Sequence, residues 1–100
     1  AGHVKSAETI GLEMLRELRG QVQHNAFTRF RVSLHSGVAC AILNRFRREL
    51  LKLEEARGIT VEVVDDPKVA PTQFVVAAAR AGGDWMVRKV SEVDDYVRNS

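Results

Sequence analysis

The spacing of hydrophobic residues in the first quarter of the chain predicts an amphipathic helix. Apolar residues recur every three or four positions over residues 7–24, and Ser6 is the candidate N-cap. Gly11 and Gly20 interrupt this pattern, and each weakens a helix by up to about 1 kcal/mol relative to alanine. We therefore expect this helix to depend on tertiary packing.

The next pattern is an alternation, followed by a longer helical stripe. Residues 27–34 alternate between apolar and polar, which predicts a half-buried strand with Arg29 and Arg31 on the face away from the core. A second helix with one apolar face should follow Ser36 as its N-cap. It should end before Gly58, because glycine suits the left-handed C′ position.

The rest of the chain predicts further strands. Alternation over Ile59–Val64 predicts a second strand, and Asp65-Asp66-Pro67 terminates it. Thr72–Ala79 is almost entirely apolar, so it predicts a strand that is central in the sheet or covered on both faces. Trp85–Val90 fits either a fourth strand or an extended arm, and Ser91 begins a weak, acidic terminal helix.

These elements predict an α/β chain, in the form of an α+β two-layer sandwich. The order is α-β-α-β-β, with a small mixed sheet of three strands, or four if the last segment joins it, and both helices on one face. The β-α-β unit predicts a parallel pair, and the short loop after it predicts that the next strand runs antiparallel. We expect one domain over residues 1–80 and a C-terminal extension over residues 81–100.

Length and composition are those of a single small domain. The chain has 100 residues, of which 45% are hydrophobic and 28% charged, within the ordinary globular range. It has no apolar run near the length of a membrane span and no signal-peptide pattern, so we expect no membrane partner and a cytoplasmic location. The first residue is not methionine, so we expect a processed or excised piece of a longer chain.

Charge is unevenly distributed, although the net charge is only +2. No acidic residue occurs between Glu17 and Glu49, whereas six arginines fall within that gap. A one-sided basic field of this kind suits a polyanion, RNA above all, and the alternative is an ordinary solvated face. The candidate RNA contacts are Arg29, Arg31, Arg45, Arg47 and Arg48.

No catalytic or metal-binding constellation is present in the sequence. Cys40 is the single cysteine, which excludes an internal disulfide, and its place beside the apolar stripe predicts a buried small residue rather than a thiolate. Asp65-Asp66 before a proline predicts a turn rather than a magnesium site. Phe30 lies on the core face, so only Phe27 is free to stack on bases, and core packing is its favoured role. We expect no cofactor or metal in this chain.

The segment VACAILNRFRRELLKLEEARGITVEVVDDP resembles the small C-terminal domain of the catalytic half of ribonuclease E/G endoribonucleases. That family has the pattern LLNxKRxxLxxIExRxGVxVxIVPNP. The matching positions here are Ile42-Leu43-Asn44, Arg47-Arg48, Leu53-Glu54 and Arg57-Gly58-Ile59. Upstream, GHVKSAETIGLEMLRELR is similar to the family's GxVRxxESLSLxILRxIEE, so the resemblance covers about residues 2–76.

The chain departs from the family pattern at two places. Asp65-Asp66 stand where the family usually has Pro-Asn, and Ala70–Phe74 stand where it has Glu-Thr-Pro-His-Tyr. The shared motifs concern packing and helix ends rather than catalysis.

The resemblance implies a supporting role in an RNA-cutting enzyme. The family enzymes cleave single-stranded RNA with magnesium, which aspartates of a preceding domain hold, and a CPxCxGxG zinc-link motif comes just before the small domain. Gly2 resembles the last glycine of that motif, and neither the aspartates nor the cysteines are in this chain. We therefore expect a catalytically silent domain that serves structure and homo-oligomerisation beside the rest of the endoribonuclease chain. The alternatives are a stand-alone basic RNA-binding module and, least favoured, a small enzyme in its own right.

Overall fold

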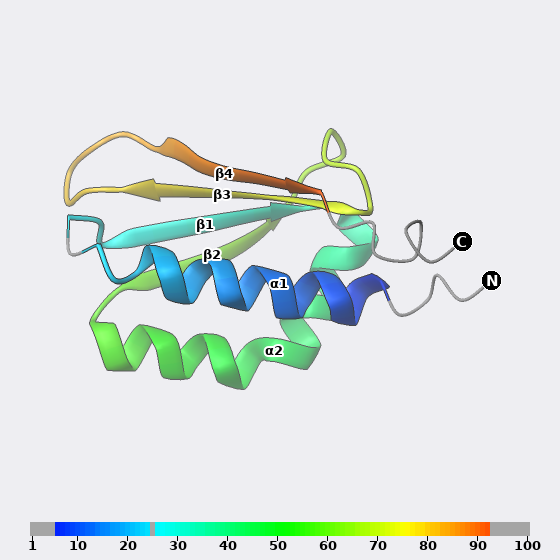
Figure 1. Cartoon of the computed structure of the whole chain (residues 1–100), viewed down its shortest axis with the longest axis horizontal. Coiled ribbons are helices and arrows are strands. Elements are labelled where there is room, and N and C mark those ends of the chain that lie inside the picture. Colours follow the sequence, from blue (N-terminus) through cyan, green and yellow to red (C-terminus); the bar gives the residue numbers. More distant parts are fainter. Residues whose placement is uncertain (1–5, 25, 93–100) are drawn as a thin grey trace.

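The computed structural model describes residues 6–24 and 26–92, and these form two helices packed on one face of a four-stranded sheet (Figure 1). The elements follow the order α-β-α-β-β-β, so the predicted two-layer α/β architecture is confirmed, with a fourth strand in place of the extended arm. Their bounds are α1 Ser6–Gln21, β1 Arg29–Leu34, α2 Ser36–Arg57, β2 Thr60–Asp65, β3 Gln73–Ala79 and β4 Met86–Glu92.

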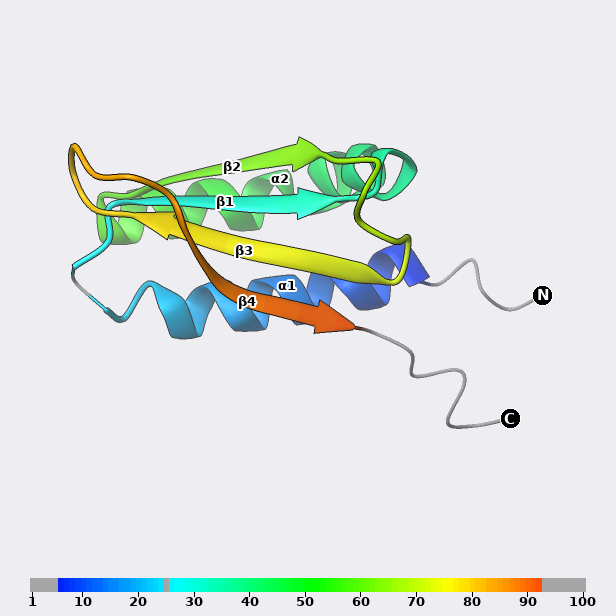
Figure 2. The ribbon, with the colours of Figure 1, turned by 90° about the horizontal axis from the view of Figure 1, so that it is seen from above.

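The sheet has the strand order β2-β1-β3-β4 and mixes parallel and antiparallel pairs (Figure 2). β1 and β2 are parallel, as the β-α-β unit predicts, with Val32 opposite Val63. β3 runs antiparallel to β1, with Val76 opposite Val32, and so runs opposite to β2 as expected. β3 does not pair with β2, however, because β1 lies between them.

The core lies between the sheet and the two helices. Alternate residues of β1 and β3 point into it, which accounts for the buried Phe30 opposite Ala78 and the buried Leu34 opposite Phe74. The helices close this face with the following buried side chains: Ile10, Met14, Leu15 and Leu18 from α1, and Ala39, Ile42, Phe46 and Leu50 from α2. Phe27 is also buried, at 7% exposure, and contacts the edge of the Phe30 ring, so its favoured role in core packing is confirmed.

The ends of α2 differ in how well the sequence predicts them. Gly58 adopts the left-handed conformation, at φ 66°, and its N–H donates to the Glu54 carbonyl at 2.8 Å, as predicted. The N-cap prediction is wrong by one residue. His35 occupies that position, with extended backbone and no side-chain cap, and Ser36 is the first helical residue.

The expectations for the C-terminal part have different outcomes. β3 is central in the sheet, which confirms the first of the two predicted alternatives, and only its helical face is covered, since Val75 and Ala77 on its other face are half-buried. The helix predicted from Ser91 is wrong. Ser91 and Glu92 belong to β4 rather than to a helix, because their backbones pair with Phe74 and Gln73. The rest of the predicted terminal helix lies outside the described residues.

Candidate functional site

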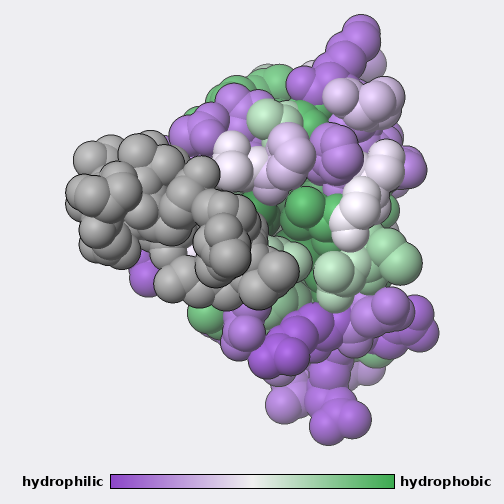
Figure 3. Space-filling view, turned by 90° about the vertical axis from the view of Figure 1, so that its right-hand side faces the viewer, coloured by the Kyte–Doolittle hydropathy of each residue, from purple (hydrophilic) through white to green (hydrophobic). Residues whose placement is uncertain are grey.

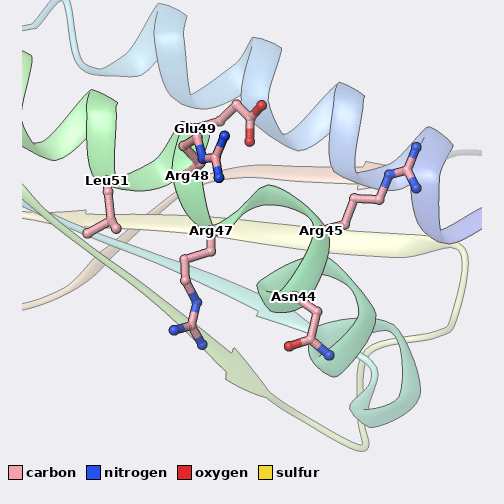
Figure 4. Close-up of a pocket in the computed structure, with 6 residues that line it drawn as sticks. All are labelled: Asn44, Arg45, Arg47, Arg48, Glu49 and Leu51. Carbon is pink, nitrogen blue, oxygen red and sulfur yellow. The ribbon is translucent and has the colours of Figure 1, made fainter.

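Three of the candidate arginines project from one stretch of α2 (Figure 4). Asn44, Arg45, Arg47 and Arg48 surround an open hollow of about 380 Å³, together with Glu49 and Leu51. All three guanidinium groups are exposed, and in Figure 4 the Arg47 side chain points away from those of Arg45 and Arg48. These three arginines therefore present positive charge on both sides of α2 rather than at a single point.

The three α2 arginines differ in their partners. Arg45 donates to the Glu8 carboxylate of α1 at 3.0 Å, an exposed pair of the kind that contributes at most about 1 kcal/mol. Arg47 and Arg48 have no carboxylate within ion-pair distance in the part of the chain that the structure describes. Arg48 lies three residues from Arg45 and four from Lys52, so these three charges share the flank of α2 that faces α1.

The other two candidates, Arg29 and Arg31, lie on the open face of the sheet. Their guanidinium carbons stand 5.0 and 4.1 Å from the centre of the Trp85 ring, within the range of cation–π contacts. Arg29 also donates to the carbonyls of Arg80 and Gly83, at 3.1 and 2.6 Å. Arg31 pairs with Glu62 on the neighbouring strand at 3.2 Å. These arginines therefore fasten the β3–β4 connection to the sheet.

The candidate arginines thus occupy separate surfaces instead of one basic field. Arg29 and Arg31 project from the sheet face opposite the helices, and Arg45, Arg47 and Arg48 project from the helical layer. The acid-free stretch of sequence suggested a single face because it is contiguous along the chain. The fold divides it because β1 and α2 belong to different layers.

We predict that Arg29→Ala loosens β4 without unfolding the domain. The substitution removes two hydrogen bonds to loop carbonyls and one cation–π contact, each modest at a partly exposed site, so the free energy of unfolding should fall by less than about 2 kcal/mol. Amide hydrogen exchange should become faster in β4 than in β2, and the fluorescence of Trp85 should report a wetter environment. Arg29→Lys should give a smaller effect, because lysine keeps the charge but lacks the planar fork. Unchanged exchange in β4 would contradict this role for Arg29.

Residues considered for nucleophilic or metal chemistry do not converge in the described part of the chain. Cys40 is exposed, so the prediction of a buried small residue is wrong, since position 40 lies just beyond the buried stripe that passes through Ala39 and Ile42. The Asp66 carboxylate accepts the Lys68 N–H at 2.9 Å, which confirms the turn. Within residues 6–24 and 26–92, no three His, Cys, Asp or Glu side chains are placed to hold a metal ion.

Two residues that matter to these surfaces escaped the sequence reasoning. Trp85 was assigned only to an extended segment, whereas it covers Arg29 and Arg31. The Glu54 carboxylate accepts the backbone N–H of Val61 at 2.7 Å, across the turn that joins α2 to β2. The Trp85 contacts have no local sequence signal, because they depend on which strands are neighbours. The Glu54 contact joins residues only seven apart, but it depends on how the chain turns at Gly58.

The fold and the surface together define a small α/β module. Some of its arginines hold the sheet and its loops together, and others are exposed and available to bind a ligand. It is a β-α-β unit followed by an antiparallel hairpin, with one uncovered sheet face. The chain belongs to the ribonuclease E/G family, since residues 1–79 match the family described as RNase E/G, Thioredoxin-like domain. No curated protein matches the chain.

The family's description calls the domain thioredoxin-like. Dithiol exchange requires two cysteines, commonly in a Cys-x-x-Cys motif, and this sequence has Cys40 alone. β4 follows the matched residues, so the strand that Arg29 and Trp85 fasten lies beyond the stretch that matches the family. No helix among the described residues is long and apolar enough to cross a membrane.

Proposed function

We propose that this domain is a non-catalytic structural and association part of an RNase E/G-type endonuclease of single-stranded RNA, acting in cytoplasmic RNA processing and decay. The family match over residues 1–79 carries the proposal. Magnesium and structural zinc would belong to the rest of the enzyme, as the resemblance implies, and the partners would be that remaining chain and further copies.

The uncovered sheet face supports the association role. Its central rows run from Val64 through Ser33 and Val75 to Val90, and from Glu62 through Arg31 and Ala77 to Val87. Val87 and Val90 are 64% and 61% exposed. Val75, Ala77, Val87 and Val90 are therefore neighbours on the β3–β4 part of this face, and an exposed apolar patch of this kind is typical of a face that another layer covers.

Sedimentation of the 100-residue chain over a concentration series tests the association. We expect reversible self-association. Val90→Asp should abolish it, because the substitution places a charge among the exposed valines of the uncovered sheet face. Leu12→Asp is the matched control, since Leu12 is 55% exposed on α1, away from this face. A chain that stays monomeric at every concentration would contradict the association role of this face.

The catalytic part of the proposal has a separate test. Labelled single-stranded RNA incubated with the 100-residue chain and magnesium should remain intact. Magnesium-dependent cleavage by the purified chain would contradict a non-catalytic role.

The second candidate function is RNA binding. It is favoured by the exposed charges of Arg47 and Arg48, which have no ion-pair partner within residues 6–24 and 26–92. In this reading the arginines of α2 contact phosphates, while Arg29 and Arg31 remain candidates only where Trp85 and Glu62 leave them accessible. The two functions are compatible, since a supporting domain can also line an RNA path.

We predict that Arg47→Ala and Arg48→Ala each flatten the salt dependence of RNA binding. For every lost phosphate contact on a single strand, the negative slope of log K against log salt should become less steep by roughly 0.7. The slope is measured from the affinity for a labelled oligouridine, determined by fluorescence anisotropy at salt concentrations between about 50 and 200 mM. Arg88→Ala is the control, because Arg88 bonds to Gln21 and stacks on Phe27. Affinity that does not change with salt would contradict RNA binding.

A further inference from the structure

The outer edge of β2 presents unpaired backbone groups. β2 is the terminal strand of the sheet, and Thr60 and Asp66 donate inward, to the carbonyls of Thr28 and Leu34. Backbone groups alternate in direction along a strand, so the N–H groups of Val61, Val63 and Asp65 point away from β1. This is the edge at which another strand can be added.

One of these three edge amides is already occupied. The Glu54 carboxylate accepts the Val61 N–H at 2.7 Å, in the place where a carbonyl of an added strand would lie. Val63 and Asp65 have no such partner among the described residues. The open part of the edge is therefore short and lies toward the C-terminal end of β2.

A hollow borders the same part of the edge. It has a volume of about 400 Å³ and lies between α2 and β2, lined mainly by Ala39, Cys40, Leu43, Val63 and Val64. Figure 3 faces the end of the molecule at which β2 finishes, and it shows hydrophobic surface between hydrophilic regions above and below. The hollow has room for apolar side chains of a bound segment.

One stripe of α2 forms the wall of this groove. Leu43, Arg47 and Leu51 are four residues apart and therefore share a flank of the helix. That flank faces β2, because Leu43 lines the hollow beside Val63 and Glu54 binds Val61. Leu43 and Leu51 are 38% and 50% exposed, so the stripe presents apolar surface on both sides of the Arg47 charge.

Arg47 favours a negatively charged group on whatever binds in the groove. Arg16, Arg31 and Arg45 each lie within 4.0 Å of a carboxylate, at 3.6, 3.2 and 3.0 Å. Arg47 has no such neighbour in the part of the chain that is described. A carboxylate on a bound segment would complete this pairing.

We propose that the groove between α2 and β2 binds an extended polypeptide segment that adds to β2 as a strand, with apolar side chains in the hollow and a carboxylate at Arg47. Backbone bonds to Val63 and Asp65 supply affinity in this mode, and the pockets for alternate side chains supply selectivity. The proposal is independent of the association role above, which uses the uncovered sheet face. It shares Arg47 with the RNA-binding candidate, and the comparison with oligouridine separates the two.

A second copy of the chain fits the groove less well than such a segment. Pairing β2 with its own symmetry mate would place the acidic residues of one strand beside those of the other, and β2 together with the next residue carries Glu62, Asp65 and Asp66. Nucleic acid fits less well because the lining is apolar and Asp65 stands at the rim.

The test uses three hexapeptides with serine at every second position, titrated into the isotope-labelled 100-residue chain. The other three positions, which share one face of the added strand, carry two valines and one glutamate, serine or lysine, so the variable side chain lies on the same side as the hollow and Arg47. We expect the Val63 and Asp65 amide protons to move downfield, and the glutamate peptide to bind about tenfold more tightly than the lysine peptide. Arg47→Glu should reverse that order, whereas Lys52→Glu, the same charge change on the opposite flank of α2, should keep it. Leu43→Asp should weaken binding at least about tenfold, and Leu12→Asp should not.

Three results would overturn the proposal. The first is that none of the peptides shifts the Val63 and Asp65 amides. The second is a concentration-dependent dimer that Leu43→Asp abolishes, which would assign the groove to a second copy. The third is that oligouridine, rather than the glutamate peptide, shifts these amides in an Arg47-dependent way.

Discussion

Gly11→Ala is expected to lower the free energy of unfolding by about 1–2 kcal/mol, although alanine is the better helix former. A Cβ atom at this position would lie 2.7 Å from Phe46 Cδ2 and Cζ and closer still to Cε2, so the buried ring would have to move. Overpacking a core typically costs about 1–3 kcal/mol, which outweighs the gain of about 1 kcal/mol in helix propensity. Thermal or urea unfolding of the purified chain measures the difference.

Gly20→Ala is the matched control on the same helix. Nothing lies within 4 Å of the atom that the substitution adds, and Gly20 is exposed in the last turn of α1. Here the propensity gain should stand alone, and stability should rise by up to about 1 kcal/mol. Gly11→Ala combined with Phe46→Leu should recover part of the loss. If both glycine substitutions raise the free energy of unfolding, the Phe46 ring can move aside without cost, and the prediction for Gly11 is wrong.

Phe30→Ala should have the largest effect, a loss of about 3–5 kcal/mol. The ring is fully buried near the start of β1, between β2 and β3 and beneath the helices, so its removal leaves a cavity that rigid strands on both sides cannot close. Domains of this size are stable by about 5–15 kcal/mol, so the variant should unfold well below the temperature of the parent chain. Calorimetry or circular dichroism on heating measures the shift.

Val87→Ala provides the comparison for a strand residue outside the core. Val87 is 64% exposed on β4, so its truncation should change stability by no more than about 0.5 kcal/mol. Comparable losses for the two variants would mean that the helices do not cover the Phe30 face as described.

Gly11 and Gly20 show what a sequence pattern can and cannot predict. Both interrupt the same helical stripe, and helix propensity assigns them the same small cost. The structure separates them, because α2 crosses α1 at Gly11 and passes no side chain near Gly20. Which helix lies against which is a property of the whole fold, so local spacing contains no sign of it.

The arginines show the same limit at the candidate site. Their positions on helix and strand follow from periodicity, and Arg29 and Arg31 do project from the uncovered face of β1 as predicted. Their contacts do not follow, since Trp85 and Glu62 reach them only after β3, β4 and β2 take their places in the sheet. The groove beside β2 was equally invisible, because it needs α2 and the outermost strand to meet.

The sequence by itself determined the element order, the strand faces, the glycine end of α2 and the family, because short-range hydrophobic spacing and turn chemistry act along the chain. Only the tertiary structure decided that β1 separates β2 from β3, that Cys40 is exposed, that Gly11 lies against the Phe46 ring of α2 and that the basic residues face different sides. Those features depend on contacts between residues far apart in sequence, and such contacts exist only once the sheet and helices have packed.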